Sequence, residues 1–495
     1  MRFFQKTKLA LLLIVFLGLF FRVYKLEIFY PWGHDQDLFA WIAKDIVINH
    51  HFRLIGQETS ITGVFIGPIF YYLISLSFAI FNMNPLSAAV VTIIISLFTI
   101  FSIYWVFKKF FGQSVGILGS FLYAISPGAV FLDRWVVPTQ PTMLWTIWFL
   151  YVLLSTLTGN FKIVIPLAIL VGLIWHIHIA FIPLLVLLPV AFWLSGRKLQ
   201  DLKFNLKSMS ITILILVFFL APFFAFELRH GFQQIKGIIR ASYQKADNLE
   251  GTSRLGKVFE SGGRSLAGAF VLSGPATNLD SGIATALPLL LFGAILYLWS
   301  IKILKKEQAV LFMVWFVIVF LGQYFSKRII TEYYFNNLFI LLFLILALVL
   351  NKLNSLSKMV PVSLLMIIYL LTVTVWFIKR DDDQGGFFYK RKAFEYIQAH
   401  SASKNYPCVA INFIESKPGG GSGSRYLYWY YKLPVIAAGS YTAVYNIVNP
   451  WTISKDEVKV RFGSLGVIIP SQEKVDPSQC LKADRQLLPL WGFTN

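Results

Sequence analysis

A short polar stretch near the N-terminus carries the residues best suited to chemistry. Residues 32–40 read Trp-Gly-His-Asp-Gln-Asp-Leu-Phe-Ala, so two carboxylates and an imidazole follow directly after a long apolar segment. A carboxylate in such a position can take the proton of an attacking hydroxyl group. We therefore expect Asp35 to act as a catalytic base. Asp37 is the nearest alternative, and His34 is an expected substrate contact.

Further polar side chains are expected at the same level of the membrane as Asp35. A lipid phosphate at the membrane interface would be bound by arginine or lysine, and Arg134, Lys327 and Arg328 are the candidates. His176 and His178 stand two residues apart, a spacing that points them to different faces of a helix and disfavours a metal pair. The expected substrate-binding residues are His34, Asp133, His176, His178, Glu332 and Tyr333.

The composition indicates the kind of protein that must position these residues. The chain is 57% hydrophobic with a mean hydropathy of +0.67, and only 14% of its residues are charged, against roughly 25% in soluble domains. Apolar runs of about 20 residues predict an all-α polytopic membrane protein. The net charge of +20 comes from cations near span ends, which favours membrane topology over nucleic-acid binding.

The hydropathy pattern predicts 11 membrane spans with the N-terminus in the cytoplasm. Arg2, Lys6 and Lys8 precede the first span, and short lysine-rich loops alternate with loops that we place outside. The predicted spans are Leu9–Tyr24, Pro85–Phe107, Val115–Phe131, Pro141–Leu157, two from a hairpin in 162–195, Ile211–Phe226, Ile283–Lys302, Val310–Phe325, one ending at Leu350, and Val360–Phe377.

The first external loop, residues 25–86, is expected to hold two helices in the membrane plane. Apolar residues from Asp37 to Ile48 recur at helical spacing. The run Val64–Phe81 is open to two interpretations, a span or an in-plane helix. We choose the in-plane helix because it leaves Lys108 and Lys109 in the cytoplasm.

Hydropathy falls near residue 379, which divides the chain into a membrane module (1–378) and an extracytoplasmic α/β domain (379–495). Phe388–Ser401 is expected to form a helix, and Cys408–Phe413 and Leu465–Pro470 are expected to form strands. Cys408 and Cys480 would both lie on the oxidising side, where they could form a disulfide or remain two thiols.

The order of three motifs resembles the GT-C superfamily of polyprenyl-phosphate-dependent glycosyltransferases, in particular the protein O-mannosyltransferases and lipid A aminoarabinose transferases. The resemblance covers about residues 8–350. It rests on Asp35–Ala40, on Gly67-Pro68-Ile69-Phe70-Tyr71-Tyr72, and on Ala124–Pro127 followed by Asp133-Arg134. The family often has Asp-Glu where this chain has Asp35-Gln36, so Asp35 takes the catalytic position and Asp37 is the substitute for the second acid.

The resemblance implies an inverting enzyme that moves a sugar from a polyprenyl phosphate to a hydroxyl group of a lipid, glycan or protein. It would work at the outer face of a bacterial or archaeal plasma membrane, without a cofactor or divalent metal. Two other hypotheses remain. A transporter or flippase of lipid-linked sugars would carry charges within its spans, and a structural partner in polymer assembly would depend on its C-terminal domain alone.

Overall fold

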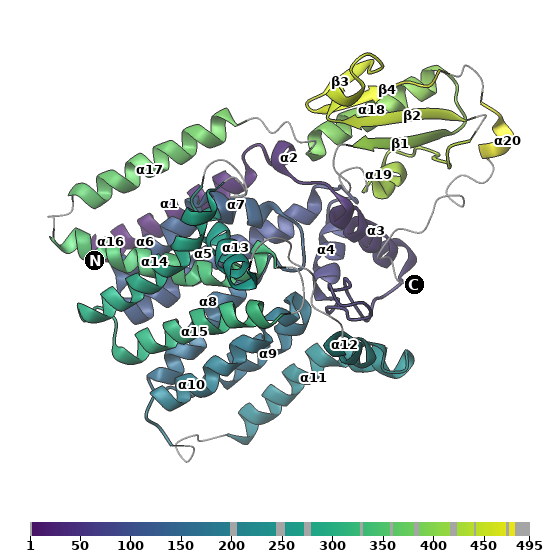
Figure 1. Cartoon of the computed structure of the whole chain (residues 1–495). Helices are drawn as coiled ribbons and strands as arrows, with labels where there is room; N and C mark the ends of the chain where they lie inside the picture. The colour runs from purple at the N-terminus through teal and green to yellow at the C-terminus, as the bar shows by residue number, and fades with distance from the viewer. Residues whose placement is uncertain are drawn as a thin grey trace.

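The computed structural model describes residues 2–198, 205–243, 253–271, 279–326, 330–356, 360–380, 386–415, 423–439, 442–471 and 475–480. Figure 1 shows a large helical module and a smaller domain with a β-sheet at one end of it. The predicted fold class, a helical membrane protein with a small C-terminal α/β domain, is confirmed.

In the described residues the helical module consists of α-helices and two 3-10 helices. They are α1 (Arg2–Val23), α2 (Leu26–Phe29), α3 (His34–Asn49), α4 (Ile69–Ile80), α5 (Ser87–Phe111), α6 (Gln113–Ile125), α7 (Pro127–Arg134), α8 (Thr142–Leu157), α9 (Val164–Ile177), η1 (Ile179–Val186), α10 (Leu187–Leu194), α11 (Leu206–Arg229), α12 (Gln233–Tyr243), α13 (Arg254–Gly268), α14 (Ser281–Ser300), α15 (Lys306–Phe325), η4 (Glu332–Leu338), α16 (Phe339–Leu356) and α17 (Val360–Lys379).

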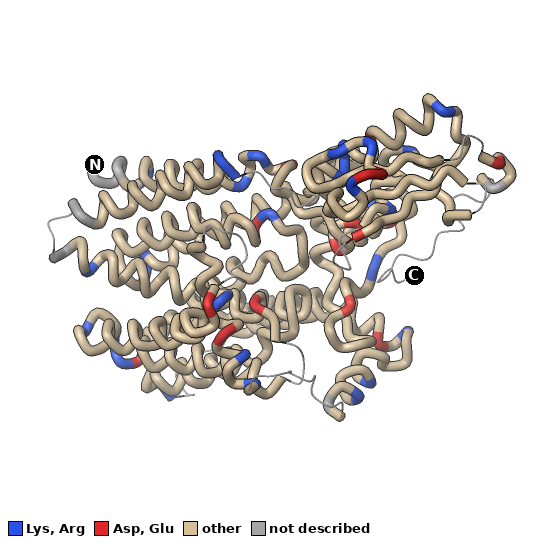
Figure 2. The backbone as a smooth tube through the Cα atoms, turned by 45° about the horizontal axis from the view of Figure 1, so that its top comes forward, with Lys and Arg blue, Asp and Glu red and all other residues tan. Residues whose placement is uncertain are grey.

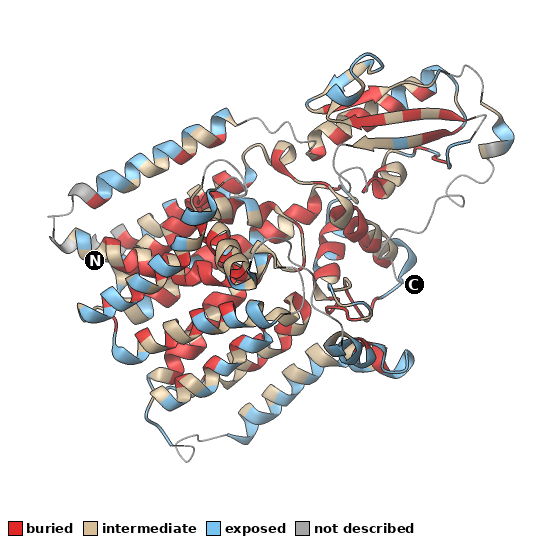
Figure 3. Cartoon of the chain, in the orientation of Figure 1, coloured by how far each residue is buried: buried red, intermediate tan, exposed pale blue. Residues whose placement is uncertain are grey.

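Six helical segments in the described residues are long and apolar enough to cross a membrane. They are Ser87–Phe111, Leu206–Arg229, Ser281–Ser300, Lys306–Phe325, Glu332–Asn354 and Val362–Lys379. Shorter apolar helices lie at three further predicted positions, over α8, α9 and η1–α10, so the count of 11 spans stays a prediction. Figure 2 shows few charges along the long helices and more near their ends. In Figure 3 α11 and α17 are largely exposed, as expected of helices that face lipid.

The predicted span Val115–Phe131 is wrong in one respect, because this segment is broken. Helix α6 ends at Ile125, and α7 begins at Pro127 and bends away by 61°. The Ser126 hydroxyl accepts a hydrogen bond from the Ala129 amide, and Pro127 stands at the first helical position, where it needs no donor. The Ser-Pro pair therefore starts a new helix, and α7 carries Asp133 and Arg134 at its end.

The run Val64–Phe81 contains one helix, α4, of 12 residues. At 1.5 Å per residue α4 is about 18 Å long, less than the roughly 30 Å of a hydrocarbon core. This length supports the choice of a non-crossing helix, and its orientation to the bilayer stays a prediction. The predicted helix Asp37–Ile48 is α3, which begins three residues earlier at His34.

The C-terminal domain packs helices against a four-stranded sheet of order β1-β2-β4-β3. Strands β1 and β2 are parallel, whereas β4 is antiparallel to both of its neighbours. Cys408 and Cys480 form a disulfide. The elements are α18 (Phe387–Ser403), β1 (Val409–Glu415), α19 (Arg425–Tyr430), β2 (Ala443–Asn449), η5 (Trp451–Ser454), β3 (Val460–Phe462), β4 (Leu465–Ile468) and α20 (Pro477–Cys480).

Two main buried clusters hold these parts together. The larger one fills the helical bundle around Trp145 and Trp315. The second joins side chains of α3 and α4, such as Phe39 and Phe78, to Tyr426 and Tyr445 of the C-terminal domain. The C-terminal domain therefore shares one apolar core with α3 and α4.

Candidate active site

A cavity of about 210 Å³ lies beside the first turn of α3. Its walls come from five places in the sequence: α3, the segment 57–66, the connection from α7 to α8, the end of α9, and η4. The side chains that line it and were expected at the site are Asp35, Asp133, His178 and Tyr333.

Asp35, like Glu58 in the same cavity, keeps accessible surface. It is half-buried, and Oδ1 accepts one hydrogen bond, from Gln57 Nε2 at 3.1 Å. Burial raises the pKa of Asp35 above its usual value, while the nearby His34 and the bond from Gln57 act in the opposite direction. A raised pKa makes this carboxylate a better proton acceptor.

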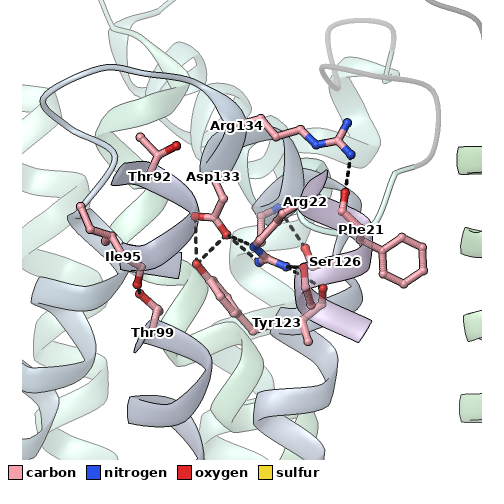
Figure 4. A network of polar contacts seen from close by, with 12 residues as sticks. Phe21, Arg22, Thr92, Ile95, Thr99, Tyr123, Ser126, Asp133 and Arg134 are labelled. Carbon is pink, nitrogen blue, oxygen red and sulfur yellow. Dashed lines mark hydrogen bonds and ion pairs between the residues drawn. The ribbon is translucent and has the colours of Figure 1, made fainter. Parts of the chain in front are cut away.

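Asp133 lines the same cavity but is held by several donors, and Figure 4 shows two of them, Arg22 and Tyr123. Oδ2 accepts from Arg22 Nη2 at 2.6 Å and Nε at 2.9 Å, and the Tyr123 hydroxyl donates to it at 2.9 Å. Gln140 Nε2 donates to Oδ1 at 3.2 Å. Only 2% of Asp133 is exposed. The carboxylate thus joins α1, α6 and α7 and offers little surface to a substrate.

Arg134, an expected phosphate ligand, points away from this cavity. Its Nη2 donates to the carbonyl oxygens of Phe21 and Tyr24, the latter at 2.8 Å, and Figure 4 shows the guanidinium directed at the end of α1. The guanidinium also lies over the Phe29 ring at 5.2 Å. Arg134 therefore binds the final carbonyls of α1, where a cation is favourable.

Asp37, the second expected catalytic acid, is fully buried on the side of the C-terminal domain. Its carboxylate accepts hydrogen bonds from the backbone amides of Arg425, at 3.1 Å, and Tyr426, at 2.9 Å. Burial raises the pKa of Asp37 to about 7, against the effect of these bonds and of Lys390. Asp37 is held by α19 and does not line the Asp35 cavity.

The three expected histidines lie in different surroundings. His178 lines the Asp35 cavity at the break between α9 and η1, where Nδ1 accepts a bond from the Ala180 amide at 3.0 Å. His176 is 3% exposed and its Nε2 contacts the Phe219 carbonyl at 2.9 Å. His34 is half-buried on the first turn of α3.

A second cavity, of about 490 Å³, adjoins the first. Both are lined by Leu132, Trp135, Tyr333 and Asn336, so they share a wall. Apolar side chains of α7 and Trp376 of α17 line part of the second cavity, and charged side chains line it as well. The charged residues that line it are Arg264, Glu332 and Arg380.

Arg264 is the cation of α13 that faces this second cavity. Its Nη2 lies 2.8 Å from Glu260 Oε1, four residues earlier on the same helix, and it interacts electrostatically with Glu332. A guanidinium has five N–H donors and can bind several acceptors at once, an anion among them. Lys327 and Arg328, the other expected phosphate ligands, lie outside the described residues.

A third cavity, of about 440 Å³, lies between α4, α5, α8 and α9. Its lining is apolar apart from His176, and it runs along α9 from Pro166 to Ile177. Pro138 and Ile177 also line the Asp35 cavity. The Asp35 cavity therefore has an arginine-bearing neighbour and an apolar neighbour.

No group of three His, Cys, Asp or Glu side chains in the described part of the chain is arranged to hold a metal ion. Independence from metal stays a prediction, because the absence of such a group does not test it.

Sequence reasoning missed several residues that the fold brings to the site. Gln57 lies in a polar loop without helical periodicity, and Arg264 lies in the long external loop 227–281. The signal for Arg264 was available, since α13 is an amphipathic helix with arginine on its polar face. No local signal pairs Arg22 with Asp133, because 111 residues separate them.

Residues 66–225 match the family described as dolichyl-phosphate-mannose-protein mannosyltransferase. The fold is similar to that of ArnT from Cupriavidus metallidurans bound to undecaprenyl phosphate, with a TM-score of 0.58 and 13% identity over 94% of this chain and 99% of that one. The apo state of the same protein gives a TM-score of 0.58 and 13% identity over 92% and 97%. No curated protein matches. The predicted resemblance to the GT-C glycosyltransferases is thereby confirmed.

Proposed function

We propose that this chain, which resembles the GT-C glycosyltransferases in sequence and fold, transfers a sugar from a polyprenyl phosphate to a hydroxyl acceptor. The observation that carries the proposal is the position of Asp35. It is a partly exposed carboxylate in a polar cavity that shares a wall with an apolar cavity lined by two arginines. This arrangement supports a role for Asp35 as a base beside a site suited to a lipid phosphate.

The proposed reaction is a single displacement at the anomeric carbon. The acceptor oxygen forms a bond to that carbon while its proton passes to an Asp35 carboxylate oxygen. The bond from the anomeric carbon to the phosphate oxygen breaks, and both of its electrons leave with the polyprenyl phosphate. One displacement inverts the configuration and needs no covalent enzyme intermediate.

The donor is proposed to occupy the second cavity. The apolar surface of α7 and α17 suits an isoprenoid chain, and Arg264 and Arg380 suit its phosphate, because guanidinium groups bind phosphate through paired donors. Lys327 and Arg328 remain predicted ligands of the same phosphate. Neither a cofactor nor a divalent metal is part of this proposal, since the arginines supply the positive charge.

The acceptor is proposed to be a lipid. The third cavity is lined by apolar side chains and meets the Asp35 cavity at Pro138 and Ile177, so it suits an uncharged hydrocarbon chain whose hydroxyl reaches Asp35. Leu173→Trp, which fills this cavity, should reduce transfer to extractable lipid. Leu321→Trp, at an exposed position on α15, is the matched control.

The same proposal places the N-terminus in the cytoplasm and the C-terminal domain outside a plasma membrane. Lys108 and Lys109 end α5 and would then lie in the cytoplasm, together with Lys305 and Lys306 at the start of α15. This distribution follows the tendency of basic residues to remain on the cytoplasmic side.

The function is tested with purified protein in liposomes of membrane lipid, supplied with radiolabelled undecaprenyl-phosphate sugars. We expect labelled product whose anomeric configuration, measured by NMR, is opposite to that of the donor. Retention of configuration contradicts the single displacement. If no donor gives product but labelled lipid crosses the bilayer, the flippase hypothesis replaces the enzyme.

A further inference from the structure

Three consecutive residues on the first turn of α3 bind three separate parts of the protein. Asp35 accepts a hydrogen bond from Gln57, and Gln36 Nε2 donates to the Val136 carbonyl at 3.0 Å. Asp37 accepts bonds from the amides of Arg425 and Tyr426 in the C-terminal domain. The position of the Asp35 side chain is thus set by its own contact and by the contacts of the two residues that follow it.

The contact through Asp37 is strong for physical reasons. The carboxylate is fully buried and receives two backbone N–H donors, and bonds from amides to a charged acceptor are roughly twice as strong as neutral ones. Lys390, also buried, and Arg425 act on it electrostatically. A buried carboxylate with such partners is costly to separate from them.

Neighbouring contacts reinforce the same junction. Trp32 Nε1 donates to the Gly423 carbonyl at 2.8 Å, and Lys390 Nζ donates to the Trp32 carbonyl at 2.8 Å. Gly423 packs directly on Gly33, since an added Cβ would lie 2.3 Å from the Gly33 oxygen, and its φ is +116°. The C-terminal domain therefore contacts the residues that begin α3.

We propose that the C-terminal domain positions the base of the transfer reaction, and that it does so through the bonds between Asp37 and the Arg425 and Tyr426 amides. Asp37 is then a positioning residue for Asp35, two residues away on the same helical turn. The inference rests on the proposed function, because it assigns a catalytic purpose to the docking of this domain.

The mechanical argument follows from the geometry of a helix start. The first turn of a helix has unpaired amides and frays easily unless its side chains are held. A displacement of about 1 Å in a reacting group can cost on the order of 10²-fold in rate. Release of Asp37 would loosen the turn that aims Asp35, while the donor cavity, which Asp37 does not line, would remain intact.

The experiment compares Asp37→Asn and Gly423→Ala with the full-length wild type. The oxygen of asparagine can accept only one of the two amide hydrogen bonds, because its NH₂ group then faces the second amide donor. Alanine at position 423 disturbs the same junction from the side of the C-terminal domain. Tyr445→Phe is the control, because it removes a bond to His400 within the domain and leaves the junction unchanged.

Two experiments are done on protein that elutes as a folded species. Steady-state transfer gives kcat and the donor KM, and hydrogen–deuterium exchange reports on the amides of residues 33–38. We expect kcat to fall about tenfold in both junction variants, the donor KM to stay within about twofold, and exchange at 33–38 to increase. The Tyr445→Phe control should match the wild type in all three respects.

Unchanged kcat in both junction variants overturns the proposal, even if the protein is less stable, because Asp37 would then only hold the domain in place. A wild type that transfers no sugar contradicts the proposed function instead. In that case the exchange result alone decides, and unchanged exchange at residues 33–38 overturns the positioning of α3 by the domain.

Discussion

Asp35 and Asp133 line one cavity, but their surroundings differ in nearly every respect. Asp35 is half-buried and accepts one side-chain hydrogen bond, whereas Asp133 is 2% exposed and is bound by Arg22, Tyr123 and Gln140. A carboxylate whose lone pairs are all used by fixed donors cannot readily take a proton from a substrate. The number of partners therefore distinguishes a partly exposed acid from one that links helices, where residue type and location do not.

The comparison extends to Arg264 and Arg134. The donors of Arg134 bind carbonyl oxygens at the end of α1, while Arg264 lines a cavity and pairs with Glu260. The fold thus distinguishes residues that hold helices together from residues that line the cavities, and the following predictions test that distinction.

The largest expected effect is on stability and comes from Arg22→Ala. Removing Arg22 leaves the buried Asp133 carboxylate without its ion pair, which typically costs about 3–5 kcal/mol. We expect a matching fall in the free energy of unfolding, measured by denaturation in detergent. Arg391→Ala, which breaks a partly exposed pair with Glu27, should change it by about 1 kcal/mol or less. Equal effects of the two variants would contradict the structural role of the buried pair.

Arg264→Gln should weaken donor binding. Loss of a hydrogen bond to a charged group costs about 1.5–3 kcal/mol, so the donor KM should rise roughly 10- to 100-fold. Arg254→Gln is the control, since Arg254 lies on the same helix but donates to carbonyls in the last turn of α15. An unchanged donor KM in Arg264→Gln would remove this arginine from the donor site.

Gln57→Leu should have the smallest effect and should appear in the pH profile. The bond from Gln57 stabilises the charged form of Asp35, so its loss raises the pKa of Asp35 further. Because only the deprotonated acid accepts a proton, activity is lost as the pH falls through this pKa. The midpoint of the acid limb of kcat/KM should move to higher pH by up to about one unit. Gln398→Leu, in the C-terminal domain, should leave it unchanged.

Much of the architecture could be predicted from the sequence, because the length of an apolar run and the residues that end it determine the helix formed at that place in the chain. The helices α5, α8, α11, α14, α15 and α17 follow the apolar runs closely, as does α18 in the C-terminal domain. The strand β2 was missed, since Ala443–Asn449 lacks clear alternation of apolar and polar residues. The bend at Ser126-Pro127 was also missed, although Pro at a first helical position marks it.

The chemical roles were less accessible, because they depend on contacts between distant residues. Asp35 stands in a cavity, as expected, but nothing near Asp37 in the sequence indicates that it binds amides 388 and 389 residues later. The same holds for Asp133, whose partner Arg22 belongs to another helix. Sequence reasoning selected carboxylates that the fold brings to one cavity, Asp35 and Asp133, but did not indicate which of them is held by other side chains.

The most direct test of the account compares Asp35→Asn with Asp133→Asn, with transfer expressed per folded molecule. Asparagine keeps the shape of aspartate but cannot take the proton, so Asp35→Asn should lower kcat by about 10²-fold or more while the fold and the donor KM are retained. Asp133→Asn should lower the amount and stability of folded protein, with kcat per folded molecule within about tenfold of the wild type. Wild-type transfer by Asp35→Asn, or an equal loss in both variants, would contradict the assignment of Asp35 as the base.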